Sequence, residues 1–246
     1  MPLAAVTVLN IHCLAQDQAC GLPVPGRLFC DDFNDGSISD GIPGTWLPGA
    51  SPGGLRDASS GDFVVTHSAS MSTYVQELNG VRDLSIRTKF NLPNTSRGGA
   101  DELNLWARSP LPPAVDDPAA YVGGINVDGV IYIVYFSGDR VSTVLRSAST
   151  SIDPVNNDVF LQFDIFGNEL SLTAWQDGSA KPSSPQLVAR DNRLREGGQV
   201  GFSFSPMGGT DSATLRYFEV VPEPSSILLL GLSLTVFTVR RRRGQL

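Results

Sequence analysis

Three pairs of adjacent acidic residues, Asp31-Asp32, Asp101-Glu102 and Asp116-Asp117, are the first candidates for chemistry in this sequence. Hydrolysis of a glycosidic bond uses two carboxyl groups that flank the bond, whereas neighbouring residues of a β-strand point to opposite faces of the sheet. A Glu-x-Asp-x-x-Glu triple, whose first two carboxylates would lie on one face of a strand, does not occur. The sequence therefore predicts a protein that is not an enzyme. A glycan-active hydrolase or lyase with another arrangement of acids remains the alternative.

A group of oxygen-bearing side chains is the candidate metal site. Asp31, Asp32, Asn34, Asp35 and Asp40 fall within ten residues, and calcium prefers hard oxygen ligands of this type. Turns rich in Asp and Gly also form without a metal, and the spacing of an EF-hand is absent. Calcium is kept as a candidate cofactor, with Asp32 and Asp35 as the expected ligands.

Three aromatic residues are the candidate contacts for a glycan: Trp46, Trp106 and Tyr132. Protein sites for sugars combine an aromatic face with a few well-placed polar groups. Trp106 and Tyr132 lie in strand-like segments and could face the surface of a sheet. The alternative for each of the three is a place in the hydrophobic core.

The charge of the chain argues against nucleic acid as a partner. The 246 residues carry 18 Lys+Arg and 25 Asp+Glu. Without the four arginines and the single glutamate that follow Val221, 14 basic side chains face 24 acidic ones, which gives a net charge of −10. Proteins that bind phosphate backbones need basic surfaces.

The N-terminal segment Met1–Ala15 contains no Asp, Glu, Lys or Arg and is similar to the apolar and cleavage regions of a signal peptide, although a basic first region is missing. The alternative is an ordinary buried strand. Cleavage after Ala15 would leave two cysteines, Cys20 and Cys30, and an even pair in an exported protein predicts a disulfide. Two free thiols are the alternative.

Three different segments follow one another at the C-terminus: a polar segment with two prolines, an apolar run of thirteen residues (Ile227–Val239) and a block of arginines. The apolar run predicts a single hydrophobic helix of about 20 Å, which is short for a bilayer core of about 30 Å. The arginines should stay on the cytoplasmic side. The residues concerned are Val221, Pro222, Glu223, Pro224 and Ser225, then Ile227, Leu228, Leu229, Leu230, Leu232, Leu234, Val236, Phe237 and Val239, then Arg240, Arg241, Arg242 and Arg243.

This order of segments resembles the PEP-CTERM sorting signal of Gram-negative bacteria that build extracellular polysaccharide. The resemblance implies export, transient anchoring in the inner membrane and recognition of Pro222-Glu223-Pro224 by an exosortase-type membrane protease. The released protein would then reach the cell surface or the extracellular space. A plain tail anchor that is never cleaved is the alternative.

The sequence between the two ends predicts an all-β domain. Short runs rich in β-branched and aromatic residues alternate with turn residues, and no long amphipathic helix is apparent. The predicted strands are Arg27–Phe33, Asp62–Thr66, Thr73–Gln76, Leu84–Asn91, Glu102–Arg108, Tyr121–Asn126, Val130–Phe136, Arg140–Ser147, Asp158–Phe166, Glu169–Gln176, Gln186–Arg190, Gln199–Ser205 and Ala213–Val220.

Four stretches of this domain resemble concanavalin A-like (laminin-G-like) domains. They are Phe29–Ser37 with the following Trp46, Val159–Gly178, Gly197–Phe202 and Leu215–Val220. The resemblance implies an antiparallel jelly-roll sandwich whose last strand lies beside its first. We expect residues 16–221 to form this sandwich, between a signal-like segment (1–15) and a sorting tail (222–246).

Taken together, the sequence predicts an exported protein of the cell envelope or extracellular matrix that binds carbohydrate or forms part of an exopolysaccharide matrix. Extracellular polysaccharide, the exosortase and the inner membrane are the expected partners. A module for adhesion to other proteins is a further alternative.

Overall fold

The structure of the protein is a computed structural model, which describes residues 20, 26–37, 46–48, 55–67, 71–75, 78, 80–93, 101–110, 119–138, 141–205 and 211–222. All the secondary-structure elements within these residues are β-strands, and all the paired strands are antiparallel. The predicted all-β class is therefore confirmed. The predicted signal-like segment 1–15 and the C-terminal helix lie outside the described residues.

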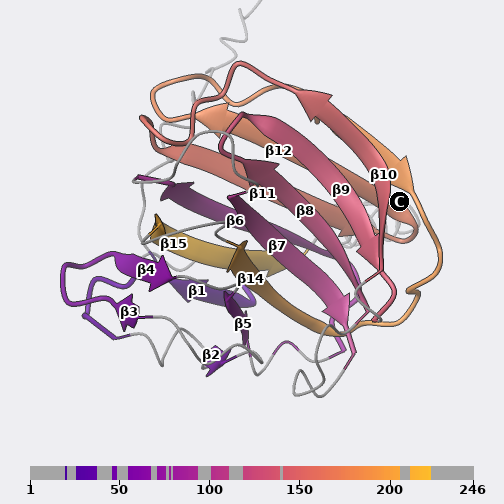
Figure 1. Ribbon diagram of the computed structural model, residues 1–246. Helices are drawn as coiled ribbons and strands as arrows, with labels where there is room; N and C mark the ends of the chain where they lie inside the picture. The colour runs from indigo at the N-terminus through magenta and orange to yellow at the C-terminus, as the bar shows by residue number, and fades with distance from the viewer. Residues whose placement is uncertain are drawn as a thin grey trace, which may run out of the picture.

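The strands form two sheets that face each other as a sandwich (Figure 1). The first sheet has the order β13-β12-β11-β6-β15-β4-β3, and β1 pairs with β15 beside this path. Its strands are β1 (Phe29–Asp31), β3 (Leu55–Asp57), β4 (Phe63–His67), β6 (Leu84–Asn91), β11 (Val159–Phe166), β12 (Glu169–Gln176), β13 (Leu187–Arg190) and β15 (Asp211–Pro222).

The second sheet has the order β10-β9-β8-β7-β14-β5-β2. In Figure 1 most of it lies in front of the first sheet, with β10 at one edge. Its strands are β2 (Trp46–Pro48), β5 (Met71–Val75), β7 (Glu102–Ser109), β8 (Ala120–Asn126), β9 (Val130–Phe136), β10 (Ser142–Ser149) and β14 (Gln199–Ser205).

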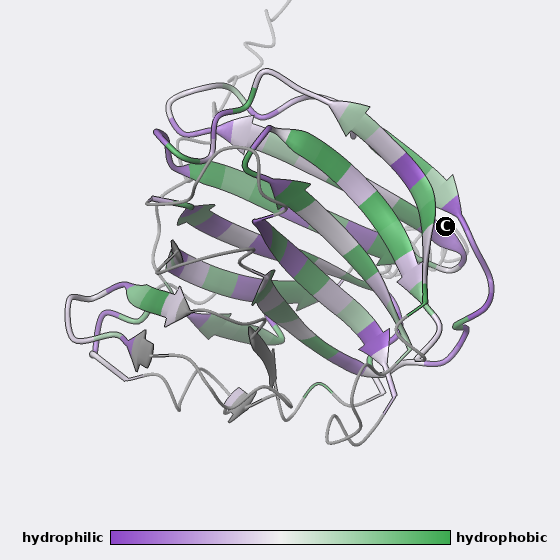
Figure 2. Ribbon diagram, viewed as in Figure 1, coloured by the Kyte–Doolittle hydropathy of each residue, from purple (hydrophilic) through white to green (hydrophobic). Residues whose placement is uncertain are grey.

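Alternation of side chains explains why these segments form strands with one buried face. In β6, Leu84, Ile86 and Phe90 are fully buried in the core, while Arg87 and Lys89 point to the other face. Figure 2 shows the resulting change between hydrophobic and hydrophilic residues along the strands. The β11–β12 hairpin closes through the predicted Gly-Asn turn, and Gly167 adopts a φ of 56° there, which glycine accommodates readily.

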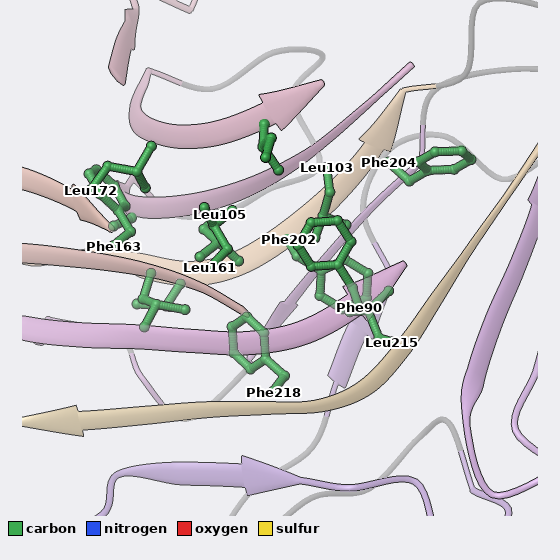
Figure 3. Packing of buried hydrophobic residues seen from close by; sticks show 14 of the residues in the cluster. Phe90, Leu103, Leu105, Leu161, Phe163, Leu172, Phe202, Phe204, Leu215 and Phe218 are labelled. Carbon is green, nitrogen blue, oxygen red and sulfur yellow. The ribbon is translucent and has the colours of Figure 1, made fainter. Parts of the chain in front are cut away.

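The core lies between the two sheets and is rich in aromatic residues. Figure 3 shows side chains from both sheets meeting there, among them Phe90, Phe163, Phe202 and Phe218. Trp46 belongs to the same core: only 7% of it is exposed, its ring lies 4.9 Å from that of Phe29, and its Nε1 donates to Asp31 Oδ2 at 2.6 Å. The prediction that Trp46 offers a platform to a glycan is therefore corrected, because its ring fills the interior.

The first and last strands lie side by side, as the resemblance implied. Phe29 pairs with Val220 and Asp31 with Phe218 across β1 and β15. A disulfide joins Cys20 to Cys30 of β1, with Cα atoms 5.6 Å apart. The first and last strands thus join in the first sheet, and the disulfide fixes Cys20 covalently to β1.

Candidate ligand-binding face

The outer face of the second sheet carries a second apolar cluster, separate from the core. Alternate residues of β7, β8 and β9 point away from the first sheet, because their neighbours along each strand fill the core. Trp106, Ala120, Val122 and Val134 form this cluster, and the half-buried Tyr132 and Phe136 pack against it. Ala120 and Val122 are fully buried and Val134 is almost so, which leaves Tyr132 and Phe136 as the partly exposed members of this cluster.

Trp106 forms the floor of this face. Its ring stacks on Phe136 with centroids 5.1 Å apart, and its Nε1 donates to Ser203 Oγ of β14 at 2.6 Å. Only 8% of Trp106 is exposed. The structure therefore places Trp106 on the predicted face, but beneath Phe136, which is the more accessible ring.

Tyr132 is held by two polar residues of β7. Its hydroxyl lies 2.5 Å from Glu102 Oε2 and 2.8 Å from Asn104 Oδ1, and Asn104 Nδ2 donates to Glu102 Oε1 at 3.1 Å. Burial raises the pKa of Tyr132 well above its usual value, and the charge and hydrogen bond of Glu102 raise it further. The hydroxyl therefore stays protonated and has a single hydrogen to donate.

Gly124 of β8 makes this arrangement possible. A Cβ atom at this position would lie 2.4 Å from Asn104 Oδ1 and 2.6 Å from the ring of Tyr132, both closer than real Cβ contacts. Only a residue without a side chain lets the tyrosine and the asparagine meet above the strand.

A hollow of about 320 Å³ opens over these residues. The edge strand β10 supplies one wall, including Val144, which is 61% exposed. The hollow has an apolar side and a polar side, as sites for small ligands do. It is lined by Glu102, Asn104, Val130, Tyr132, Val134, Phe136, Ser142, Val144 and Ser147.

Of the acidic pairs that the structure describes, only Asp101-Glu102 contributes a residue to this hollow. Asp101 is 1% exposed, whereas Glu102 of the same pair lines the hollow, as expected for neighbours in an extended chain. Glu102 is the one carboxylate among the described residues that line it. The pair Asp116-Asp117 lies outside the described residues.

The candidate calcium ligands instead accept hydrogen bonds from nearby backbone. Asp32 accepts from the N–H groups of Cys20 (2.9 Å) and Asn34 (3.3 Å), and Asp35 accepts from Ser37 at 2.8 Å. In the described part of the chain, no group of three or more His, Cys, Asp or Glu side chains is placed to hold a metal ion. Asp40 lies outside it.

The structure thus brings together Trp106 and Tyr132 of the three predicted aromatic residues and leaves Trp46 in the core. Sequence reasoning did not single out Glu102, Asn104, Phe136 or Gly124 as parts of one site. The alternation of Glu102, Asn104 and Trp106 was a usable signal for a common face. The contribution of Phe136 and Gly124 depends on strand register, which the sequence does not display.

The predicted sorting segment begins inside the last strand. Val221 and Pro222 are its final residues and pair with Ser85 and Leu84 of β6. Glu223, Pro224, Ser225, the apolar run and the arginines lie outside the described residues. No helix among the described residues is long and apolar enough to cross a membrane.

A family model described as the PEP-CTERM protein-sorting motif matches residues 220–243. The resemblance of the tail is therefore confirmed, and the motif indicates a protein that is exported and sorted to the cell surface. No curated protein matches the chain.

Solved structures match the sandwich. A Bacillus subtilis protein of unknown function with a galectin-like fold is 10% identical, with a TM-score of 0.60, over 80% of this chain and 96% of that one. The exoplasmic/lumenal domain of VIP36 in its Ca2+-bound form is 15% identical, with a TM-score of 0.56, over 72% of this chain and 83% of that one. Its Ca2+/Man3GlcNAc-bound form is 13% identical, with a TM-score of 0.56, over 72% and 84%. At these identities the likeness establishes the jelly-roll fold alone.

Proposed function

We propose that this exported protein binds neutral carbohydrate on the outer face of its second sheet and that it is not an enzyme. The observation that carries the proposal is the Tyr132–Glu102–Asn104 group beside the apolar surface of Phe136 and Val134, in a hollow of about 320 Å³. This volume lies at the small end of the range for ligand pockets.

The two sides of the hollow suit the two faces of a sugar ring. The C–H face of a pyranose packs against an aromatic ring such as Phe136, while its hydroxyls exchange hydrogen bonds with carboxylate, amide and serine groups. Ser142 pairs with Phe136 and Ser147 with Tyr132, and both serines line the hollow on the β10 side.

The charge of the residues that line the hollow favours a neutral sugar over an acidic one as the ligand. Glu102 is the single charged side chain among the described residues of the lining, so the carboxylate of an acidic sugar would meet repulsion there. A two-carboxylate hydrolase would need a second acid about 5–10 Å from the first, which the described lining does not supply. Carbohydrate bound to VIP36, a protein with a similar fold, is consistent with sugar binding by this architecture.

The sorting motif supports a cell-surface location for this carbohydrate binding. We infer that an exosortase-type protease recognises Pro222-Glu223-Pro224 while the apolar run 227–239 rests in the inner membrane with Arg240–Arg243 on its cytoplasmic side. The sandwich is then delivered to the surface, where extracellular polysaccharide is the ligand. Calcium at Asp32 and Asp35 stays a minor part of the proposal, because both carboxylates already accept backbone hydrogen bonds.

Binding to an array of neutral and acidic glycans, followed by calorimetry on the best ligand, tests the proposal. Tyr132→Phe removes one hydroxyl from the hollow and should weaken binding about tenfold. Tyr135→Phe is the matched control, because Tyr135 lies on the same strand but packs against the core. Binding to no glycan would favour the adhesion alternative, and equal losses in the two variants would place the ligand elsewhere.

A localisation experiment tests the sorting part. Intact mass and fractionation of the exported protein should show loss of the arginine block in the wild type. Deleting Pro222-Glu223-Pro224 should leave the full tail in the inner membrane. A wild-type protein that keeps its arginines and remains in that membrane would contradict processing.

A further inference from the structure

The end of the sandwich from which the C-terminal tail leaves is marked by one row of paired residues. Pro222 pairs with Leu84, Leu84 with Ile165, Ile165 with Leu170, and Leu170 with Ala189. Residues 82–83, the turn 166–169 and the segment 190–196 lie just beyond this row. We call these three segments the exit end, because they border the point where Pro222 leaves the first sheet.

The tail keeps the exit end close to any membrane that the apolar run enters. Five residues of chain lead from Pro222 to Ile227, the first residue of that run. Fully extended, they span at most about 18 Å. This step rests on the membrane insertion of the tail that the proposed function includes. While the tail is inserted, the exit end therefore lies at the membrane surface.

The charge of the exit end differs from that of the rest of the domain. It holds four arginines (Arg82, Arg190, Arg193 and Arg195), joined by the nearby Arg108, against Asp83, Glu169, Asp191 and Glu196. Residues 1–221 together carry a net charge of −10. An acidic domain is repelled by an anionic membrane, and this repulsion is weaker at the exit end, where five arginines face four carboxylates.

Two of these arginines have no carboxylate partner among the described residues, although Arg195 Nε donates to the carbonyl of Asn192 at 3.3 Å. Arg108 pairs with Asp83, Arg190 with Glu169 and Arg193 with Asp191. Arg82 and Arg195 are exposed and pair with no carboxylate among the residues that the structure describes. Unpaired surface guanidinium groups bind phosphate oxygens strongly.

Arg82 and Arg195 line one hollow of about 300 Å³. Its other described lining residues are Gly167, Asn168, Asn192 and Leu194, so guanidinium and amide groups line it and carboxylates do not. This set of donors matches the phosphate of a lipid headgroup.

A buried arginine holds the walls of this hollow in place. The side chain of Arg108 is fully buried, and its guanidinium donates to the carbonyl of Arg82 (3.1 Å), the carbonyl of Leu194 (2.8 Å) and Asp83 (3.2 Å). Asp83 in turn accepts from the Gly167 N–H at 2.8 Å. Arg108 also adopts a φ of 53°, which non-glycine residues seldom do. The Arg108 side chain thus joins residues 82–83 to the segment 190–196, and Asp83 joins the turn 166–169 to them.

An exposed aromatic residue stands at the same end. Phe166 is 51% exposed and precedes the turn that lines the hollow. Aromatic side chains on the surface of peripheral proteins enter the boundary between headgroups and acyl chains.

From these observations we propose that the exit end docks on anionic phospholipid while the tail is in the membrane. Arg82 and Arg195 bind headgroup phosphate in the hollow between them, and Phe166 enters the interface. Docking holds the sandwich in one orientation above the membrane, with Pro222 next to the bilayer.

Hydrogen exchange of the full chain in vesicles tests this proposal. Vesicles of phosphatidylcholine alone are compared with vesicles of phosphatidylcholine and phosphatidylglycerol at a ratio of about 7:3. Anionic lipid should slow exchange in peptides covering 163–170 and 189–197, because each arginine near an anionic surface favours contact by about fivefold. Arg82→Gln/Arg195→Gln should remove this difference. Arg146→Gln, which changes an exposed arginine of β10, should leave it intact.

Several results would overturn the proposal. These are equal exchange in both kinds of vesicle, protection that survives in the double variant, and loss of protection in Arg146→Gln. Failure of the chain to float with either vesicle would do the same. Protection of these peptides by a soluble polyuronate, but not by phosphatidylglycerol, would assign the hollow to an acidic glycan instead. Glycan binding on the second sheet is measured without vesicles, through Tyr132→Phe, so the two proposals can fail separately.

Discussion

Replacing Gly124 by alanine should damage the proposed binding site more than it damages the fold. The new methyl group would start 2.4 Å from Asn104 Oδ1 and 2.6 Å from the Tyr132 ring, so both must move until the contacts exceed 3.0 Å. Overpacking of this kind costs about 1–3 kcal/mol. The smaller entropy of the unfolded alanine chain returns about 0.4–1 kcal/mol, so we expect a net loss of stability of about 1–2 kcal/mol.

Binding should fall by at least about tenfold in the same variant, because the hydroxyl of Tyr132 leaves its position between Glu102 and Asn104. Gly123→Ala is the matched control. Its methyl group would point into the core, 2.7 Å from Leu172 and 2.8 Å from Phe163, and would leave the outer face untouched.

Thermal unfolding and calorimetry with the best glycan from the array measure the two effects. Each kcal/mol of destabilisation should lower the melting temperature by about 2–4 °C in a domain of this size. Both variants should lose stability, but only Gly124→Ala should lose affinity. Wild-type affinity in Gly124→Ala, or equal losses of affinity in the two variants, would refute the assignment of the site.

Two further predictions concern stability. Replacing Cys20 and Cys30 together by serine should lower the free energy of unfolding by about 3 kcal/mol, because the disulfide closes a short loop whose freedom in the unfolded chain is then restored; urea unfolding measures this, and an unchanged midpoint would contradict it. For Asp191, burial acts to raise the pKa, but hydrogen bonds from Arg193 and Tyr121 outweigh it and hold the pKa below its usual value. The stabilisation is therefore present above about pH 4 and is lost as the pH falls through the lower pKa of the folded state. Asp191→Asn should be less stable than the wild type at pH 7, and the difference should shrink as the pH is lowered below about 4. A difference in the free energy of unfolding that stays constant over this range would contradict the prediction.

Much of the fold could be predicted from the sequence because the longer strands carry a clear alternation of apolar and polar residues. The predicted segments 84–91, 130–136, 169–176 and 199–205 have the same bounds as β6, β9, β12 and β14. Two three-residue strands, β2 and β3, were missed. Segments this short show no period, and their pairing with β5 and β4 determines them.

The site could be predicted only in part. Tyr132 and Trp106 were identified by residue type, but a lone aromatic residue does not show which face of a sheet it occupies. Trp46 illustrates this, since its ring lies in the core among Phe29, Phe202 and Phe218. The hollow itself depends on how β10 is placed beside β9, which is a property of register across strands.

The position of β15 also has a consequence for the order in which the protein is made and folded. This strand pairs with β1, β4 and β6 in the first sheet, yet it is the last strand of the sandwich to be synthesised and exported. The first sheet therefore cannot close while the chain is still crossing the membrane, because contacts this distant in sequence form only when both segments are present. Because the matched sorting motif begins at residue 220, within β15, the last strand pairs of the first sheet and the start of the motif become available together.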